Sequence, residues 1–343
     1  MIRSLRNVDF MQNGDVGSFE RTDDSVQDQP RTLERSLTKE DRVYEAAAVA
    51  GGLSTLVILA FIGFFLFARS SLVFSEVGWG FFTSTSWRPD ASPPEFGIVS
   101  ILYWTVIISI IALTIAMPVS VLTALFLVEY SPRGLRGPLR TLVDLLAAIP
   151  SLIYGLWGLF FLQPHLVGIA KWLSDHASFV PIFRVTEPTF TGSAFIVSVV
   201  LALMILPIIT SIVREVLEQT PPGEKEAALA LGGTRSGMVR SVMLPFARGG
   251  IIGGSMLGLG RALGETIAVA IILSPSLIIS PRILETGTNS IASLIALKFG
   301  EADELSLSAL MAAGLTLFAL TLTVNFIASF VVARSRSGAG VDA

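Results

Sequence analysis

The sequence has no cysteine, only two histidines and few charged residues. The absence of cysteine excludes disulfides, thiolate metal sites and cysteine nucleophiles. His165 and His176 fall in one polar segment, and we expect neither a metal site nor a catalytic group from them. Charged residues make up 15% of the 343 positions, whereas soluble domains carry about a quarter. A net charge of −3 argues against a nucleic-acid-binding surface.

Apolar residues dominate instead, since they form 52% of the chain and its mean hydropathy is +0.70. A helix needs about 20 apolar residues to cross a bilayer, and six stretches are long enough. The sequence therefore predicts an all-α, polytopic membrane protein with six transmembrane helices. The expected spans are roughly 46–67, 98–128, 139–162, 193–213, 249–273 and 305–333.

Lysine and arginine are distributed unevenly between the connections. One set holds fourteen of them in 70 residues, and the opposite set holds six in 90. The rich set comprises 31–45, 131–140, 214–248 and 334–343, and the poor set comprises 69–97, 163–192 and 274–304. Because basic residues favour the cytoplasmic side, both termini are predicted to be cytoplasmic.

The first 40 residues are polar and mixed in charge, and they lack the apolar segment of a signal peptide. Too little apolar surface is available there to offset the entropy of ordering. We therefore expect a disordered cytoplasmic tail over 1–40 and a transmembrane domain over 41–335.

The connection 214–248 carries signals for two short helices. Residues 220–222 (TPP) form a helix start, and the glycines at 232–233 form a stop. A helix of about nine residues is expected between them, followed by a second over about 234–244. The first has only a small apolar face, which is too small for a core but suits a groove in another protein.

A spaced motif lies in the same connection. Glu226-Ala227-Ala228 is followed by three residues, Gly232, nine residues and the sequence VMLP at 242–245. This pattern resembles the EAA signature of ABC-importer permeases, with Val242 in the isoleucine position. The resemblance implies a coupling helix that docks in a cleft of a cytoplasmic ATPase. The docking residues it implies are Glu226, Ala227, Ala228, Leu231 and Gly232.

The chain itself has no G-x-x-x-x-G-K-[ST] loop. We therefore expect no cofactor in this chain, no enzymatic activity of its own, and ATP with Mg²⁺ bound by a partner ATPase.

Three further stretches resemble the phosphate-specific transport permeases of the PstC type. They are AAIPSLIYGLWGLFFL at 147–162, LGLGRALGETIAV at 257–269 and TNSIASLIA at 288–296. The resemblance covers about residues 40–333 and implies a permease subunit for inorganic phosphate in the bacterial plasma membrane. Besides membrane lipid, the implied partners are a PstA-type second permease, two copies of a PstB-type ATPase and a PstS-type binding protein.

Two opposite charges, Arg261 and Glu265, lie inside the fifth expected span. Arg261 is thirteen residues after Arg248 and fourteen before Pro275, which places it near the midplane. A charge at a helix centre costs roughly 2.5–3.5 kcal/mol on insertion scales, and the Arg-first order is the weaker one for a pair four residues apart. We therefore expect both side chains to line the substrate path, where the planar donors of Arg261 suit phosphate oxygens.

Glu265 would repel the same anion. We expect it to pair with Arg261, or with a basic residue of the partner subunit, while the path is empty. Thr266 and Ser151 are further path candidates. Ser151 follows Pro150, where a broken helix would present its positive N-terminus to an anion. Small residues at four-residue spacing predict close helix packing, and the candidates are Gly250, Gly254, Gly258, Gly260 and Gly264.

Three alternatives remain open at this point. A permease for another oxyanion, such as molybdate or sulfate, would differ in its binding protein and in competition experiments. A membrane scaffold or sensor of phosphate status would leave initial transport rates largely intact when deleted. A channel would have no use for the ATPase-docking motif.

Overall fold

The computed structural model describes residues 38–336. Six of its helices are long and apolar enough to cross a membrane, which confirms the predicted all-α, multi-pass fold. The two strands, β1 (Trp87–Arg88) and β2 (Glu95–Phe96), pair antiparallel. The expected tail at 1–40 lies almost entirely outside the described residues, and the predicted orientation of the termini stays a prediction.

The chain divides into two units between Thr55 and Leu56, and each is described by itself. In the first unit, the described residues from 39 onward belong to helix α1 (Lys39–Arg69), and their side chains are exposed. Since 18-residue windows of this helix are strongly apolar, lipid or another subunit is the expected environment.

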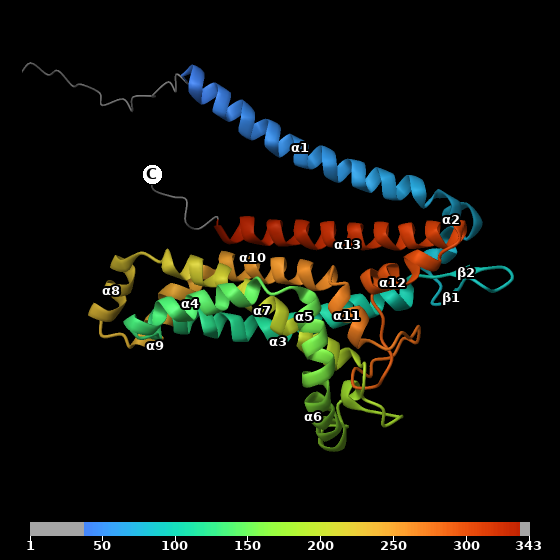
Figure 1. Cartoon of the computed structure of the whole chain (residues 1–343). Coiled ribbons are helices and arrows are strands. Elements are labelled where there is room, and N and C mark those ends of the chain that lie inside the picture. Colours follow the sequence, from blue (N-terminus) through green and yellow to red (C-terminus); the bar gives the residue numbers. More distant parts are fainter. Residues whose placement is uncertain (1–37, 337–343) are drawn as a thin grey trace, which may run out of the picture. The chain divides into compact units, whose positions relative to one another are not determined.

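The second unit contains the remaining elements (Figure 1). Its longer helices are α3 (Val99–Leu125), α4 (Arg133–Ala147), α6 (Gln163–His176), α7 (Ala194–Glu218), α10 (Leu244–Leu263) and α13 (Glu304–Arg336). Its shorter helices are α2 (Ser71–Glu76), α5 (Ser151–Trp157), α8 (Pro222–Ala230), α9 (Arg235–Met238), α11 (Ile267–Ile272) and α12 (Ile291–Lys298). Single turns of other helix types are η1 (Gly78–Phe82), η2 (Phe126–Tyr130), η3 (Gly158–Leu162), η4 (Pro181–Phe183), η5 (Val239–Met243) and η6 (Phe299–Glu301).

Helix α7 is the centre of the second unit, because two thirds of its most apolar window is buried. It runs parallel to α3, and hydroxyls join the two helices. Ser198 donates to Ile108 O at 3.1 Å, and Ser120 donates to Leu206 O at 3.0 Å. Interhelical hydrogen bonds of this kind help to fix helix pairs in lipid, where packing has no strong hydrophobic driving force.

The third and fifth expected spans are each broken. The expected span 139–162 falls on α4 and α5, which are separated at 148–150 because Pro150 cannot continue the hydrogen-bond ladder of α4. From Ser151 the helical segment continues to His176, well beyond the expected end. The expected span 249–273 falls on α10 and α11, which are separated at 264–266. The break at 264–266 corrects the expectation of one continuous fifth span, whereas the break at 148–150 lies where Pro150 indicated one.

The second helix expected in the 214–248 connection is not separate from the fifth span. Residues 235–263 form one continuous helical segment through α9, η5 and α10. Thr234 caps its start, since the Thr234 Oγ1 accepts from Gly237 N at 3.1 Å. The preceding helix α8 has the expected nine residues. Any displacement of α8 therefore acts on a segment that runs directly to the membrane centre.

Candidate functional site

The depth of Arg261 follows from the packing of α10 on α7. A Cβ on Gly258 would lie 2.7 Å from Ile209 Cδ1, and one on Gly250 would lie 2.5 Å from Val216. The two helices therefore pack closely and run antiparallel. Gly258 sits beside the middle of α7, which extends from Ala194 to Glu218. Arg261, one turn further along, lies near the same level in the membrane.

Arg261 is exposed, and among residues 38–336 it makes no ion pair. It borders a cavity of about 490 Å³ together with Ile208 of α7 and with Thr321 and Asn325 of α13. A mid-membrane guanidinium must face protein or water, because lipid does not solvate it. This cavity provides such an environment and leaves the donors of Arg261 free.

Glu265 does not pair with Arg261 in this structure. The helix ends at Leu263, so the two residues no longer share one helical face. Glu265 is buried, and its Oε1 accepts from Ala268 N at 3.3 Å in the first turn of α11. Thr266 precedes α11, and its hydroxyl donates to Gly264 O at 3.3 Å. The expected Arg261–Glu265 contact is thus absent from this conformation, because Gly264 ends the helix.

The two broken helices meet at this level. A Cβ on Gly155 of α5 would lie only 2.9 Å from Ala268 Cα of α11, so the backbones approach as closely as glycine permits. Ser151 begins α5 one turn before that contact and is half-buried. Irregular backbone is tolerated at membrane depth only where it is buried in protein or borders water. The structure therefore brings the breaks at 148–150 and 264–266 together at the membrane centre.

The glycines expected for helix packing divide by partner. Gly250, Gly254 and Gly258 face α7, where a Cβ on Gly254 would meet Ile212 at 3.2 Å. Gly260 faces α13, since its Cβ would lie 3.9 Å from Asn325 Oδ1. Gly264 instead follows the end of α10 as its C-cap residue.

Helix α8 lies at one end of the bundle (Figure 1). Glu226, Ala227 and Leu231 are exposed, and 90% of the Leu231 surface is accessible. Ala228 is the exception, because it packs against the core of the bundle. Gly232 has φ +83°, a left-handed conformation that favours glycine and stops the helix. Most residues of the EAA motif are therefore exposed on α8, and Ala228 packs the helix against the bundle.

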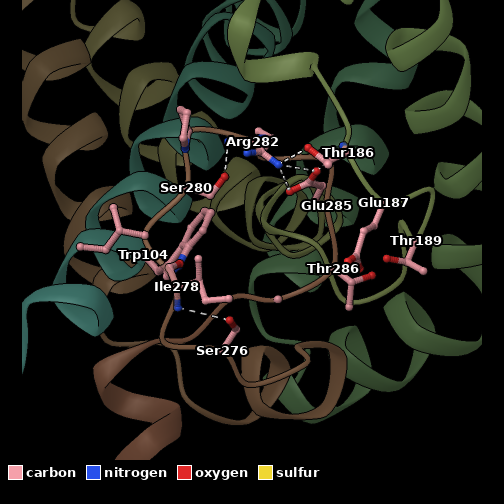
Figure 2. Close-up of a pocket in the computed structure, with 13 residues that line it drawn as sticks. Trp104, Thr186, Glu187, Thr189, Ser276, Ile278, Ser280, Arg282, Glu285 and Thr286 are labelled. Atoms are coloured by element: carbon pink, nitrogen blue, oxygen red, sulfur yellow. Dashed lines mark hydrogen bonds and ion pairs between the residues drawn. The ribbon is translucent and has the colours of Figure 1, made fainter. Parts of the chain in front are cut away.

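At the opposite end, two loops enclose a pocket of about 310 Å³ beside Trp104 (Figure 2). The loop before α7 contributes Thr186, and the loop after α11 contributes Arg282 and Glu285. Arg282 Nη1 lies 3.0 Å from Glu285 Oε1 and also donates to the Thr186 hydroxyl. The Thr186 backbone N–H donates to the same carboxylate. This network joins loops that are about 100 residues apart in sequence.

The charge of Glu285 is stabilised by that network. Burial alone would raise the pKa of its carboxyl, but the hydrogen bonds from Thr186 N–H and Arg282 and the Arg282 charge outweigh burial. The pKa therefore lies below the ordinary glutamate value. Glu285 is outside the spanning segments, so the Arg282–Glu285 pair stabilises the loop after α11 and does not border the substrate path.

Residues 116–337 match the family described as the binding-protein-dependent transport system inner membrane component. The chain belongs to this family. It is similar to "Phosphate transport system permease protein PstC 2" of Mycobacterium tuberculosis, with 41% identity over 90% of this chain and 95% of the relative. A PstC of Xylella fastidiosa is 41% identical over 81% of this chain and 89% of its own length.

A solved structure shares the fold at lower identity. It is the crystal structure of a bacterial ABC transporter involved in alginate import, with a TM-score of 0.55, 16% identity and coverage of 86% of this chain and 98% of that one. As a member of the family, the chain is a multi-pass permease subunit of a bacterial plasma-membrane ABC transporter. Such a subunit works with an ATPase and with a second permease or a binding protein.

Two residues of the central site were not among the expected site residues. Tyr154 of α5 donates its hydroxyl to Leu146 O at 2.9 Å, across the α4–α5 break. Asn325 borders the Arg261 cavity from α13. Their polarity inside spans was the available signal, but sequence spacing gave no contact to Arg261. No sequence motif indicated the network of Arg282, Glu285 and Thr186.

Proposed function

We infer that this chain is the permease subunit of an ATP-driven importer of inorganic phosphate. The observation that carries the proposal is Arg261, a guanidinium free of ion pairs among the described residues, beside a cavity at mid-membrane. Relatives similar over most of the chain are named phosphate transport permeases, which supports phosphate as the anion. A guanidinium can bind two oxygens of phosphate through two parallel N–H donors.

The two helix breaks supply the rest of the path. Ser151, Glu265 and Thr266 lie at these breaks and do not border the Arg261 cavity in this conformation. We propose that the two hydroxyls meet phosphate elsewhere along the path and that Glu265 opposes the anion there. Weak net attraction suits a transporter, because a substrate that binds too tightly is not released. Since Glu265 holds the first turn of α11 here, it would influence both the position of that helix and phosphate release.

Energy would come from outside the chain. We propose that α8 faces the cytoplasm and docks on a PstB-type ATPase through Glu226, Ala227, Leu231 and Gly232, with ATP and Mg²⁺ bound by that partner. A PstA-type permease would complete the path, the transporter would carry two ATPase copies, and a PstS-type protein would deliver phosphate to the opposite face. The exposed motif residues of α8 support this arrangement.

The test is phosphate uptake by Arg261→Lys in a strain that depends on this transporter. Lysine keeps the charge but loses the planar donor pair, so uptake should fall by at least about tenfold. Arg248→Lys, in the same helix, is the matched control and should retain uptake. Molybdate and sulfate in excess should not compete. Normal uptake by Arg261→Lys, or strong competition by either oxyanion, would reject phosphate binding by Arg261.

A further inference from the structure

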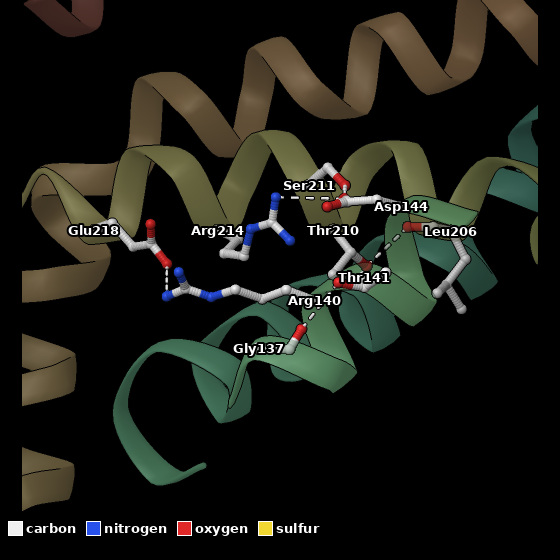
Figure 3. A network of polar contacts seen from close by, with 9 residues as sticks. All are labelled: Gly137, Arg140, Thr141, Asp144, Leu206, Thr210, Ser211, Arg214 and Glu218. Carbon is white, nitrogen blue, oxygen red and sulfur yellow. Dashed lines mark hydrogen bonds and ion pairs between the residues drawn. The ribbon is translucent and has the colours of Figure 1, made fainter. Parts of the chain in front are cut away.

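Four charged residues join α4 to α7, and we call them the α4–α7 ion pairs (Figure 3). Arg140 of α4 contacts Glu218 of α7, and Asp144 of α4 lies 3.4 Å from Arg214 Nη2 of α7. Asp144 Oδ1 also accepts from Ser211 Oγ at 2.9 Å. The helices run antiparallel, so each acid meets the arginine of the other helix.

These pairs are more than scattered surface contacts. Each helix contributes one arginine and one acid four residues apart, so the two bonds hold two successive turns in register. Arg214 is mostly buried, with 16% of its side chain accessible, its partner Asp144 is 51% accessible, and the other pair is about one-third accessible. Two pairs on successive turns resist sliding better than an isolated exposed pair, which contributes little.

One end of this contact lies beside the coupling helix. Glu218 is the last residue of α7, and only residues 219–221 separate it from α8. Thr220 in that connection is buried, and its hydroxyl donates to Leu217 O at 2.9 Å. The connection is short and anchored, so a displacement of α8 acts directly on the end of α7 that holds Arg140.

The other end reaches the membrane centre. Helix α4 stops just before the break at 148–150, and Tyr154 of α5 donates to Leu146 O in its last turn. The next residue of α5, Gly155, approaches the backbone of Ala268 in α11, seven residues after Arg261. At its start α4 is held as well, because Arg136 Nη2 donates to Val128 O at 2.5 Å. Helix α4 therefore connects the α8 end of the bundle to the central site.

We propose that the α4–α7 ion pairs make α4 move with α7, so that a displacement of α8 repositions the α4–α5 break beside Arg261. The four residues are positioning residues and do not touch substrate. The inference rests on the proposed function, because it assigns to α4 the transmission of ATPase-driven motion. Helix α4 lies outside the EAA segment, so it adds a second mechanical connection to the one through α9 and α10.

Charge exchange tests the pairs directly in the complete transport complex, reconstituted in proteoliposomes. Arg140→Glu and Glu218→Arg singly should each lower the phosphate transported per ATP hydrolysed by about fivefold. The double variant re-forms the pair in reverse and should return to within about twofold of wild type. Singles that keep the wild-type ratio, or a double variant no better than the worse single, would overturn the proposal.

A covalent connection covers the case in which charge variants fail to assemble. The chain has no cysteine, so Arg140→Cys with Glu218→Cys introduces the only two thiols of this subunit. This variant should lose coupling, and a flexible bifunctional thiol reagent should restore it by joining α4 to α7. Cross-linking that leaves coupling lost, or that blocks a functional transporter, would contradict joint movement of the two helices.

Two results separate this inference from the proposed function. Suppose that the wild-type complex moves no phosphate while charge exchange still rescues stimulated ATP hydrolysis. Phosphate is then the wrong substrate, and joint movement of α4 and α7 is supported. Suppose instead that wild type moves phosphate, that Gly232→Asp uncouples ATP hydrolysis from transport, and that charge exchange gives no rescue. ATPase docking by α8 is then supported, and joint movement of α4 and α7 is rejected.

Discussion

At three places in this chain an arginine is followed four residues later by an acid, and the three pairs of residues are used in two ways. In 140–144 of α4 and 214–218 of α7, each arginine pairs with the acid of the other helix. In 261–265, neither residue makes an ion pair within the described part of the chain, and the helix ends between the two residues. The same local pattern thus gives a structural contact near α8 and an unpaired cation at the membrane centre.

The two uses of charge occur at different depths in the bundle. Near the end of the bundle, an ion pair costs less to form because part of each side chain remains hydrated. At mid-membrane, an unpaired arginine is expensive and persists where a cavity and a binding role accompany it. Arg140 and Arg214 pair where two helices are in contact, and the unpaired Arg261 is the residue that we propose binds the anion.

The largest expected effect comes from giving Arg261 a fixed partner. Asn325→Asp places a carboxylate in the same cavity and should make the centre resemble the α4–α7 contact. Phosphate must then displace that carboxylate, so the initial uptake rate should fall by about tenfold, which corresponds to ~1.4 kcal/mol. Asn325→Ser, which adds no charge, is the control. Equal uptake by the two variants would show that pairing Arg261 does not matter.

The converse change removes a partner from Arg214. Asp144→Asn leaves that mostly buried guanidinium without its carboxylate, but Asp144 is 51% accessible, so solvent screening reduces the loss to roughly 1 kcal/mol. The melting temperature of the purified complex should fall by about 2–4 °C. Glu215→Gln changes an exposed acid next to Arg214 on α7 and should leave the melting temperature unchanged. A similar decrease in both variants would mean that the Asp144–Arg214 contact adds no stability.

The smallest expected effect concerns Glu285, which pairs within a loop. Because its folded pKa lies below the ordinary value, its charge stabilises the fold at neutral pH. That contribution is lost as pH falls from the unfolded value near 4.3 through the lower folded pKa. Glu285→Gln should therefore lower the melting temperature at pH 7 and match wild type progressively below about pH 4.

Glu187→Gln provides the comparison for that experiment. Its side chain borders the same pocket, whereas only its backbone supports the Glu285 carboxylate. A melting difference between Glu285→Gln and wild type that stays constant from neutral pH down to low pH would exclude the carboxylate charge as its cause.

Local signals predicted much of the fold. Prolines at 221–222 and glycines at 232–233 delimit α8 with its nine residues, since helix caps depend on adjacent residues alone. The hydropathy of the spans gave the six membrane helices. Arg261 was placed near the midplane by counting from the span ends, and its packing level against α7 agrees. Proline also indicated a possible break before Ser151.

Local sequence signals could not predict contacts between segments that are distant in the chain. The break at 264–266 was not expected, because Gly264 fits a continuous span equally well by composition. Nothing in the spacing of Arg140 indicated Glu218, which lies 78 residues further along. Likewise, the approach of Gly155 to Ala268 depends on how α5 and α11 pack, which no single segment encodes.

The membrane environment, the six spans, the ends of α8 and the depth of Arg261 could all be predicted from the chain, because each follows from local composition and from the thickness of a bilayer. Which charges pair, where the fifth span breaks and which helices meet beside Arg261 became known from the packed bundle alone. These features depend on which faces of different helices come into contact, and that is set by the packing of the whole bundle.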